Sequence, residues 1–151
     1  MVELIVVIVI LGILAAVALP RFMGLEREAR VAAVKSLGGT LLSASNMAHG
    51  VAMARNITNG NLNMEGSPVT FVNGYPSNAT VWNLVQSSDG FARVANTWTK
   101  TGAATANCWV RYNQATLGAN GAVNAPTLTY NNMNATAANG AAIDGTLRVA
   151  C

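Results

Sequence analysis

An apolar stretch at the N-terminus constrains this chain more than any other feature. Residues 1–19 read MVELIVVIVILGILAAVAL, and Glu3 carries the only charged side chain among them. At about 1.5 Å per residue, a helix of this length measures roughly 28 Å, close to the ~30 Å hydrocarbon core of a bilayer. The stretch is therefore long enough to span a membrane as one helix.

A cleaved secretory signal is the alternative interpretation of this stretch. The apolar region of such a signal is usually about 7 to 15 residues long and is followed by a cleavage site with small residues. Here the apolar run passes into a helical pattern with no break in register. We therefore favour a helix that stays attached to the domain that follows it.

Glu3 is the unusual residue of the stretch. An acid at the centre of a membrane helix costs about 2.5 to 3.5 kcal/mol, and less near an end, so an ionisable residue in such a segment is a candidate functional residue. Glu3 can lie among the lipid headgroups and be solvated there. It can also pair with a positive charge from another copy of the chain, such as a terminal amine, in which case it would specify register more than stability.

Charged residues are sparse and form no block that favours nucleic-acid binding. They make up 10% of the 151 residues, the net charge is +3, and the densest basic group is interrupted by Glu26 and Glu28. No basic residue precedes the apolar stretch, and Arg21 follows it, although the positive-inside rule places basic residues on the cytoplasmic side. For a head outside the cytoplasm, we expect that a basic leader has been removed.

The chain has two cysteines, Cys108 and Cys151, and neither lies in a CxxC pair. The single histidine, His49, has no partner at the spacing of metal ligands. A disulfide is favoured over two free thiols, and it indicates an oxidising compartment. We predict no metal site and no cofactor.

Residues 21–55 have the period of an amphipathic helix. Apolar or small residues recur there at three- and four-residue intervals: Phe22, Leu25, Ala29, Ala33, Leu37, Leu41, Ala44, Ala48 and Val51. This pattern continues the helix of residues 1–20, so we predict one helix of more than 50 residues that ends near Asn56. So long a helix, compared with a mean of about 11 to 12 residues, needs support from the rest of the fold.

The remaining sequence completes a predicted α+β fold with a globular head over residues 21–151. We predict a loop region at residues 56–96, with a short strand within 69–76 and a helical turn near 80–85. A β-sheet and disulfide region follows at 97–151. Alternation of apolar and polar residues predicts antiparallel strands with one face on the helix: residues 97–99, 108–112, 127–130 and 146–151.

The segment ELIVVIVILGILAAVALPRF resembles the N-terminal segment of type IV pilins. The run VIVILGILAA, with the later Gly74–Tyr75–Pro76, is similar to the MSHA-like branch of type IVa major pilins. The resemblance covers residues 1 to about 55. Glu3 and Pro20 keep the seventeen-residue spacing between a glutamate and a proline in that family, which implies that two residues, Phe-Thr, precede Met1 in the mature chain.

The resemblance implies a life cycle and a role for each matching residue. A prepilin peptidase removes a leader, and the subunit waits in the inner membrane until the assembly machinery extracts it into a helical filament. There Glu3 neutralises the terminal amine of a neighbour, and Gly12 and Pro20 bracket a kinked or locally melted helix segment. Proline alone predicts at least a kink, because it lacks an N–H. The family also places a disulfide at the C-terminal end of the head, as Cys108 and Cys151 would.

The sequence carries no recognisable catalytic motif. It has no acid–base pair, GxSxG elbow, P-loop or dinucleotide-binding glycine pattern, so we predict that the chain is not an enzyme and takes no small-molecule substrate. The favoured function is a major pilin of an extracellular type IV pilus, for adhesion, twitching motility or uptake, with a host surface, phage or DNA as partner. The alternatives are a pseudopilin or minor pilin of a type II secretion or priming complex, and a monomeric anchored binding module.

Overall fold

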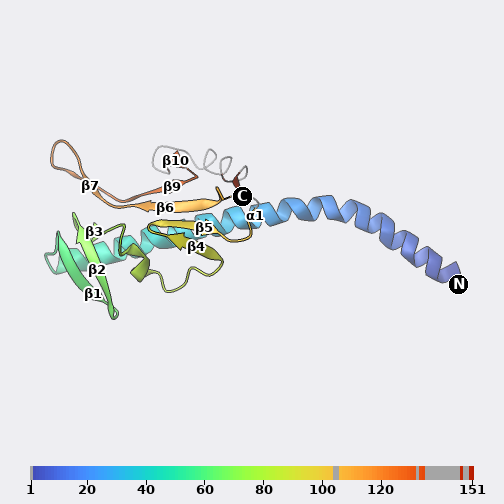
Figure 1. The fold of residues 1–151 in the computed structure, drawn as a ribbon, viewed down its shortest axis with the longest axis horizontal. Coiled ribbons are helices and arrows are strands. Elements are labelled where there is room, and N and C mark those ends of the chain that lie inside the picture. The colour runs from blue at the N-terminus through green and yellow to red at the C-terminus, as the bar shows by residue number, and fades with distance from the viewer. Residues whose placement is uncertain (1, 104–105, 132, 135–146, 148–149) are drawn as a thin grey trace.

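A single long helix connects an exposed arm to a head of antiparallel strands (Figure 1). The structure is a computed structural model, and it describes the chain except residues 1, 104–105, 132, 135–146 and 148–149 and the side chains of residues 21 and 23. Helix α1 (Val2–Ala54) has 53 residues, and the head packs on its C-terminal half. The predicted α+β class is confirmed, including the long helix, the antiparallel sheets and the disulfide.

Helix α1 ends where the sequence predicted, near Asn56. Asn56 has a φ of 55°, in the left-handed region that asparagine tolerates. The Ile57 N–H donates to the carbonyl of Ala52 at 2.9 Å, and the Asn56 N–H donates to that of Met53 at 3.1 Å. These two bonds form a Schellman motif, in which the left-handed residue satisfies the last carbonyls of the helix.

All strand pairs that the structure describes in the head are antiparallel. The described residues form a sheet of order β1-β2-β3, a sheet of order β10-β9-β6-β5-β4, and the hairpin β7-β8. A short 3₁₀ helix, η1 (Val81–Leu84), links the first two sheets. The strands are β1 (Gly60–Met64), β2 (Ser67–Val72), β3 (Tyr75–Pro76), β4 (Phe91–Val94), β5 (Thr97–Lys100), β6 (Trp109–Asn113), β7 (Thr116–Leu117), β8 (Val123–Asn124), β9 (Thr127–Tyr130) and β10 (Met133–Asn134).

The main core lies between α1 and the inner face of the larger sheet. Trp98, Val110, Tyr112 and Leu128 come from β5, β6 and β9, and each is at most 3% exposed. The helix contributes Val31, Val34, Leu37 and Leu41 to the same cluster. A smaller cluster joins Ala48 and Ala52 to Val69 and Phe71 of β2. The alternation predicted for residues 97–99 and 127–130 is confirmed, since Trp98, Leu128 and Tyr130 face the helix.

The predicted stripe on α1 is partly wrong. Leu37, Leu41 and Ala48 are buried as expected, but Phe22 and Leu25 are 66% and 60% exposed. Among the positions of α1 whose burial is described, the buried ones begin at residue 31, and apart from Gly38 they follow three- and four-residue steps: Val31, Val34, Leu37, Leu41, Ser45, Ala48 and Ala52. The head does not cover the first turns of α1 after Pro20. The three- and four-residue spacing of apolar residues therefore begins earlier in the sequence than the buried part of the helix.

Within the predicted loop region 56–96, the expected strand in 69–76 and the expected helical turn near 80–85 are confirmed by β2, β3 and η1. Strands β1 and β4 were not predicted. Glu65 and Gly66, with φ of 49° and 84°, form a two-residue turn between β1 and β2. Asn73 and Gly74, with φ of 55° and 80°, do the same between β2 and β3. Two consecutive residues with positive φ suit the twist of a hairpin, and Asn-Gly is its strongest sequence signal.

The strand predicted at 146–151 is also wrong where the structure describes it. Leu147 and Ala150 are helical, and the Cys151 N–H donates to the Leu147 carbonyl at 2.7 Å, four residues earlier. Leu147 and Cys151 are nevertheless both buried. Positions four apart share a face in a helix as well as in a strand, so the sequence pattern could not separate the two conformations.

Gly38 lies where α1 packs against Leu128 and Tyr130 of β9. A Cβ there would collide with the Tyr130 hydroxyl and lie 3.0 Å from Leu128 Cδ1, whereas a Cβ at Gly39 would meet nothing within 4 Å. We therefore expect Gly39→Ala to stabilise the protein by about 0.5 to 1 kcal/mol, as helix propensity dictates. Gly38→Ala should destabilise it by about 1 to 3 kcal/mol through overpacking.

Urea unfolding of the full chain in detergent micelles, followed by tryptophan fluorescence, measures both variants. Because the two glycines are neighbours in one helix, they share the propensity gain and differ only in the contact with the sheet. Equal effects of the two substitutions would contradict this packing of α1 on β9.

Candidate functional site

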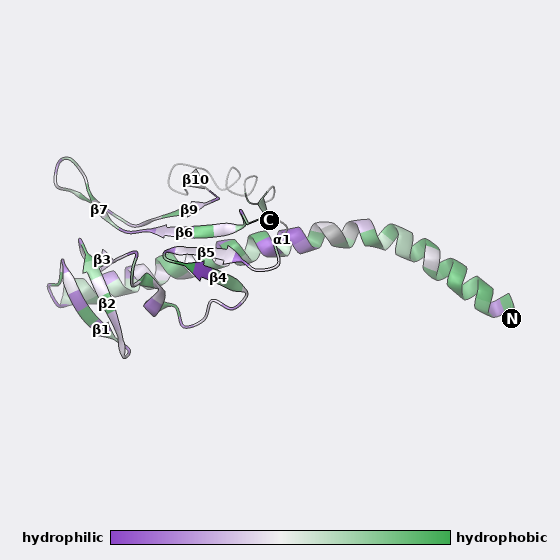
Figure 2. Ribbon diagram, in the orientation of Figure 1, coloured by the Kyte–Doolittle hydropathy of each residue, from purple (hydrophilic) through white to green (hydrophobic). Residues whose placement is uncertain are grey.

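The N-terminal arm, residues 2–20 of α1, is apolar around its whole circumference apart from Glu3. The head does not cover it (Figure 2). The large apolar side chains from Val2 to Leu19 are between 49% and 74% exposed. The helix of a soluble head normally has one polar face, and a helix that is apolar all round is normally buried. By length and composition this part of α1 can cross a membrane. The arm is therefore a surface that requires lipid or protein around it.

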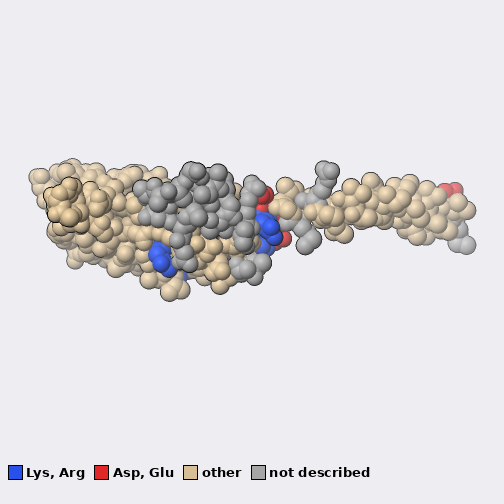
Figure 3. Space-filling view, turned by 90° about the horizontal axis from the view of Figure 1, so that it is seen from above, with Lys and Arg blue, Asp and Glu red and all other residues tan. Residues whose placement is uncertain are grey.

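Glu3 lies in the first turn of α1 and is exposed. Glu3 is the only charged residue in the first 20 positions of the sequence, and Figure 3 shows acidic atoms at the tip of the arm. The first turn is the positive end of the helix dipole, where a carboxylate is favoured by about 0.3 to 1 kcal/mol. The structure thus places the single charge of the apolar stretch at its far end, where the side chain can face a neighbouring molecule.

Gly12 and Pro20 lie within continuous helix in this single chain. Figure 1 shows that α1 bends in its exposed half, and proline inside a helix is a usual cause of such a bend because its ring displaces the preceding turn. A Cβ on Gly12 would meet nothing within 4 Å. The locally melted segment between Gly12 and Pro20 stays a prediction for an assembled state.

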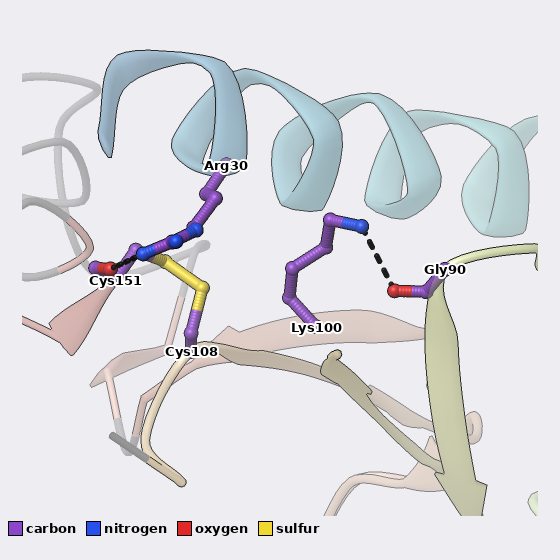
Figure 4. Close-up of a disulfide and its surroundings, with 5 residues drawn as sticks. All are labelled: Arg30, Gly90, Lys100, Cys108 and Cys151. Atoms are coloured by element: carbon purple, nitrogen blue, oxygen red, sulfur yellow. Dashed lines mark hydrogen bonds between the residues drawn. A yellow bond between two sulfur atoms is a disulfide. The ribbon is translucent and has the colours of Figure 1, made fainter. Parts of the chain in front are cut away.

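Charged residues gather where the arm meets the head (Figure 3). Arg30 forms an ion pair with Glu26 one helical turn earlier, and its Nη1 donates to the Cys151 carbonyl at 3.2 Å. Because Arg30 is on α1 and Cys151 forms the disulfide with Cys108, this hydrogen bond joins the disulfide to the helix (Figure 4). The border between the apolar arm and the head is therefore polar, with Arg30 and Glu26 paired there.

The disulfide joins Cys108 to Cys151 across 43 residues of sequence (Figure 4). Both cysteines belong to the main core, where Cys108 directly precedes β6. Cys108 and Val110 face the helix together, as the alternation predicted. The bond holds Cys151 next to Cys108 at the start of β6, and Leu147 is buried in the same core cluster. The predicted disulfide is confirmed.

A buried polar network, which the sequence did not reveal, connects α1 to the head. The Tyr112 hydroxyl donates to the Pro76 carbonyl at 3.0 Å and lies 2.8 Å from Ser45 Oγ, which donates to it. One turn along the helix, His49 Nδ1 donates to the Gly74 carbonyl at 2.7 Å, and its ring stacks on Tyr75 at 3.9 Å. The Gly74–Tyr75–Pro76 motif thus fixes the helix against β3. The Asn73–Gly74 dipeptide was the signal that could have located it.

Burial raises the pKa of Tyr112 to about 12, an effect that the Ser45 hydrogen bond partly offsets. In the unfolded chain the Tyr112 phenol ionises near pH 10. Its contribution to the free energy of unfolding is therefore complete below pH 10 and is lost between about pH 10 and 12. We expect a loss of about 2 to 3 kcal/mol over that interval. Burial of Tyr130 raises its pKa and acts in the same direction.

Tyr112→Phe provides the control for this pH dependence. It should cost about 1 to 3 kcal/mol at pH 8, because Ser45 and Pro76 each lose a buried partner, and it should flatten the decline above pH 10. Urea unfolding in detergent from pH 8 to 12 measures both effects. An equal decline in the variant would show that the network does not carry it.

The described residues contain no group of three or more His, Cys, Asp or Glu side chains that could hold a metal ion. They do form a groove of about 550 Å³ between α1, the β1–β2 turn, η1 and β4. Its lining includes the aromatic and sulfur-containing side chains of Met47, Met64, Trp82 and Trp98. The lining also includes polar and charged side chains, among them Glu65, Ser88 and Arg93, so the groove combines apolar and polar groups.

Comparisons with known proteins do not assign the chain to a family. No protein-family model matches it, and no curated protein and no solved structure matches it significantly. The function therefore has to be inferred from the arm, the head and the disulfide.

Proposed function

We propose that this chain is the major structural subunit of an extracellular type IV pilus, and that it acts by polymerisation and not by catalysis. The observation that carries the proposal is the arm. It is apolar all round, uncovered by its own head, and carries a single acid at its far end. An anchor that only held a head to a membrane would have no use for that acid.

Transfer between two apolar environments explains the composition of the arm. Before assembly the arm lies in the inner membrane, since each large apolar side chain gains about 1.5 to 3 kcal/mol on leaving water. In the filament the arms of neighbouring subunits surround one another instead. Lipid and protein are similarly apolar, so the hydrophobic effect supplies little preference between them. Packing and polar pairs must then favour the filament.

Glu3 supplies such a pair. In the filament its carboxylate meets the amino terminus of a neighbouring subunit, so the acid that is costly in lipid is compensated by an opposite charge. A buried ion pair is an established means of specifying register. The disulfide supports an oxidising location for the head, because such bonds persist outside the cytoplasm. Adhesion, twitching motility and uptake are the activities that such a fibre serves.

Electron microscopy of material sheared from producing cells, combined with mass spectrometry of its subunit, tests the proposal. We expect helical fibres made of this chain, with the Cys108–Cys151 bond intact and a methylated residue at the N-terminus of the mature subunit. Dispersed chains confined to the membrane fraction, with no fibres, would contradict the proposal and favour a monomeric anchored module. Short complexes with secretion components would favour a pseudopilin.

A further inference from the structure

Asn-Gly dipeptides in this chain are candidate sites of a spontaneous chemical modification. In such a pair the backbone nitrogen of the glycine can attack the side-chain amide of the asparagine, because glycine has no Cβ to obstruct the approach. The sequence contains four Asn-Gly pairs, at 59–60, 73–74, 120–121 and 139–140. The structure describes the first three, and the sequence alone does not distinguish them.

The pairs at 59–60 and 73–74 are tied to each other by contacts between distant segments. Asn59 Oδ1 accepts a hydrogen bond from the Asn73 N–H at 3.0 Å. The Gly74 N–H donates to the Thr58 carbonyl at 2.6 Å, and Gly60 is the first residue of β1, which pairs with β2. Either glycine nitrogen can therefore reach its asparagine only if β1 and the turn between β2 and β3 separate.

The pair Asn120–Gly121 is held only by local contacts. It lies exposed at the tip of the β7–β8 hairpin, which projects from the head (Figure 1). The Gly121 N–H donates to the Gly118 carbonyl at 2.9 Å, and the Gly118 N–H donates to the Ala122 carbonyl at 2.8 Å. The hairpin below the tip has two pairs of opposite residues, and so short a two-stranded ribbon is marginally stable. The tip can thus open without disturbing the core.

The side chain of Asn120 is curled toward the backbone that follows it. The Ala122 N–H donates to Asn120 Oδ1 at 3.2 Å, which forms an Asx turn. Gly118 leaves room for this arrangement, since a Cβ there would lie 3.1 Å from the same Oδ1 atom. When a nucleophile attacks Cγ, negative charge develops on Oδ1. A backbone N–H that already points at this atom stabilises that charge.

We infer that Asn120 is a site of spontaneous deamidation, so that the tip of the β7–β8 hairpin gains a negative charge as the protein ages. Once the tip opens, the Gly121 nitrogen gives its proton to a solvent base and bonds to Asn120 Cγ. The Cγ–Nδ2 bond then breaks, and Nδ2 takes a proton from water and leaves as ammonia. Water opens the resulting succinimide ring at either carbonyl carbon, which gives aspartate or isoaspartate. The step needs no oxidant and no cofactor.

The two products change the hairpin in different ways. Residues 116–124 read TLGANGAVN and carry no charge, so either product adds the first charge to this segment. An aspartate oxygen can still accept the Ala122 N–H, whereas isoaspartate lengthens the backbone by one carbon and alters the turn. The inference concerns the head alone and holds whether or not the chain polymerises.

Peptide mapping by mass spectrometry tests the inference. The full chain with its disulfide intact is aged in detergent micelles at mildly alkaline pH, in water enriched in heavy oxygen, and is sampled over time. We expect Asn120 to deamidate at least about tenfold faster than Asn59 and Asn73, because the opening that exposes it is more populated. Formation of isoaspartate together with uptake of heavy oxygen identifies the succinimide route.

Two controls separate the effect of the structure from that of the dipeptide. In guanidinium chloride with reductant the folded contacts are lost, so the rates at the three asparagines should converge. Asn120→Gln should abolish the modification at 120, because a larger ring closes much more slowly, and should leave the rates at Asn59 and Asn73 unchanged.

Two results would overturn the inference. One is equal rates at the three asparagines of the folded chain. The other is an Asn120 that stays intact in the folded chain and deamidates only in the denaturant. Failure of the chain to form filaments would overturn the proposed function and leave this inference standing.

Discussion

Replacing Glu3 by Gln is expected to reduce the yield of filaments about a hundredfold or more, because removing one partner of a buried ion pair costs about 3 to 5 kcal/mol. Glutamine keeps nearly the same shape but leaves the amine of the neighbour without a counter-charge in an apolar core. The head should be unaffected, since Glu3 is at the far end of the exposed arm. Sheared filament protein, divided by the amount of subunit in the membrane, measures the effect.

Asp89→Asn is the matched control for Glu3→Gln. Asp89 is exposed in the head and accepts a hydrogen bond from Ser87 at 2.8 Å, which an asparagine oxygen can also accept. This variant removes the same charge without touching the arm, so its yield should equal that of the native chain. Normal amounts of Glu3→Gln filaments with an unchanged axial stagger would refute the pairing of Glu3 with a neighbouring amine.

Removing the disulfide is expected to cause the largest loss of stability in the head. The bond spans 43 residues, and the chain-entropy model assigns about 4 kcal/mol to a loop of that size. A total stability of about 5 to 15 kcal/mol is typical of a domain, so the loss is a large share of it. The double variant Cys108→Ala and Cys151→Ala avoids leaving a buried thiol or hydroxyl.

Urea unfolding of the full chain in detergent, with and without reductant, checks this expectation. The midpoint should fall for the double variant and for the reduced native chain alike, and reductant should not affect the variant. The slope of the transition should rise, because an unfolded chain without the cross-link exposes more surface. A midpoint unchanged by reduction would show that the contact of Arg30 with the Cys151 carbonyl, together with core packing, suffices.

Local patterns were enough for the features that depend on neighbouring residues in sequence. The run of apolar residues and its passage into a 3.6-residue period placed α1 within two residues of its observed bounds. Strict alternation located β5, β6 and β9 and predicted that one face of these strands packs on the helix. The structure shows that this face carries Trp98, Val110 and Leu128. The positions of Glu3, Gly12 and Pro20 in the arm follow from the helix alone.

Features that depend on distant residues were not readable in this way. The head begins on α1 only at Val31, because that is where Leu147, Cys108 and the larger sheet reach the helix. Strand β1 is rich in asparagine and looks like a loop, yet it forms because a turn at Glu65 and Gly66 aligns it with β2. The partners of Tyr112 come from segments 36 and 67 residues away in sequence.

The sequence by itself therefore determined that an apolar rod with one acid precedes a small α+β head, because hydrophobicity and periodicity are properties of adjacent residues. The tertiary structure decided which face of the rod the head covers. It also decided that Leu147 and Ala150 are helical and not extended, and that Tyr112 of β6 pairs with Ser45 of α1 inside the head. Those outcomes depend on which distant surfaces exclude water from each other, and no local pattern contains that information.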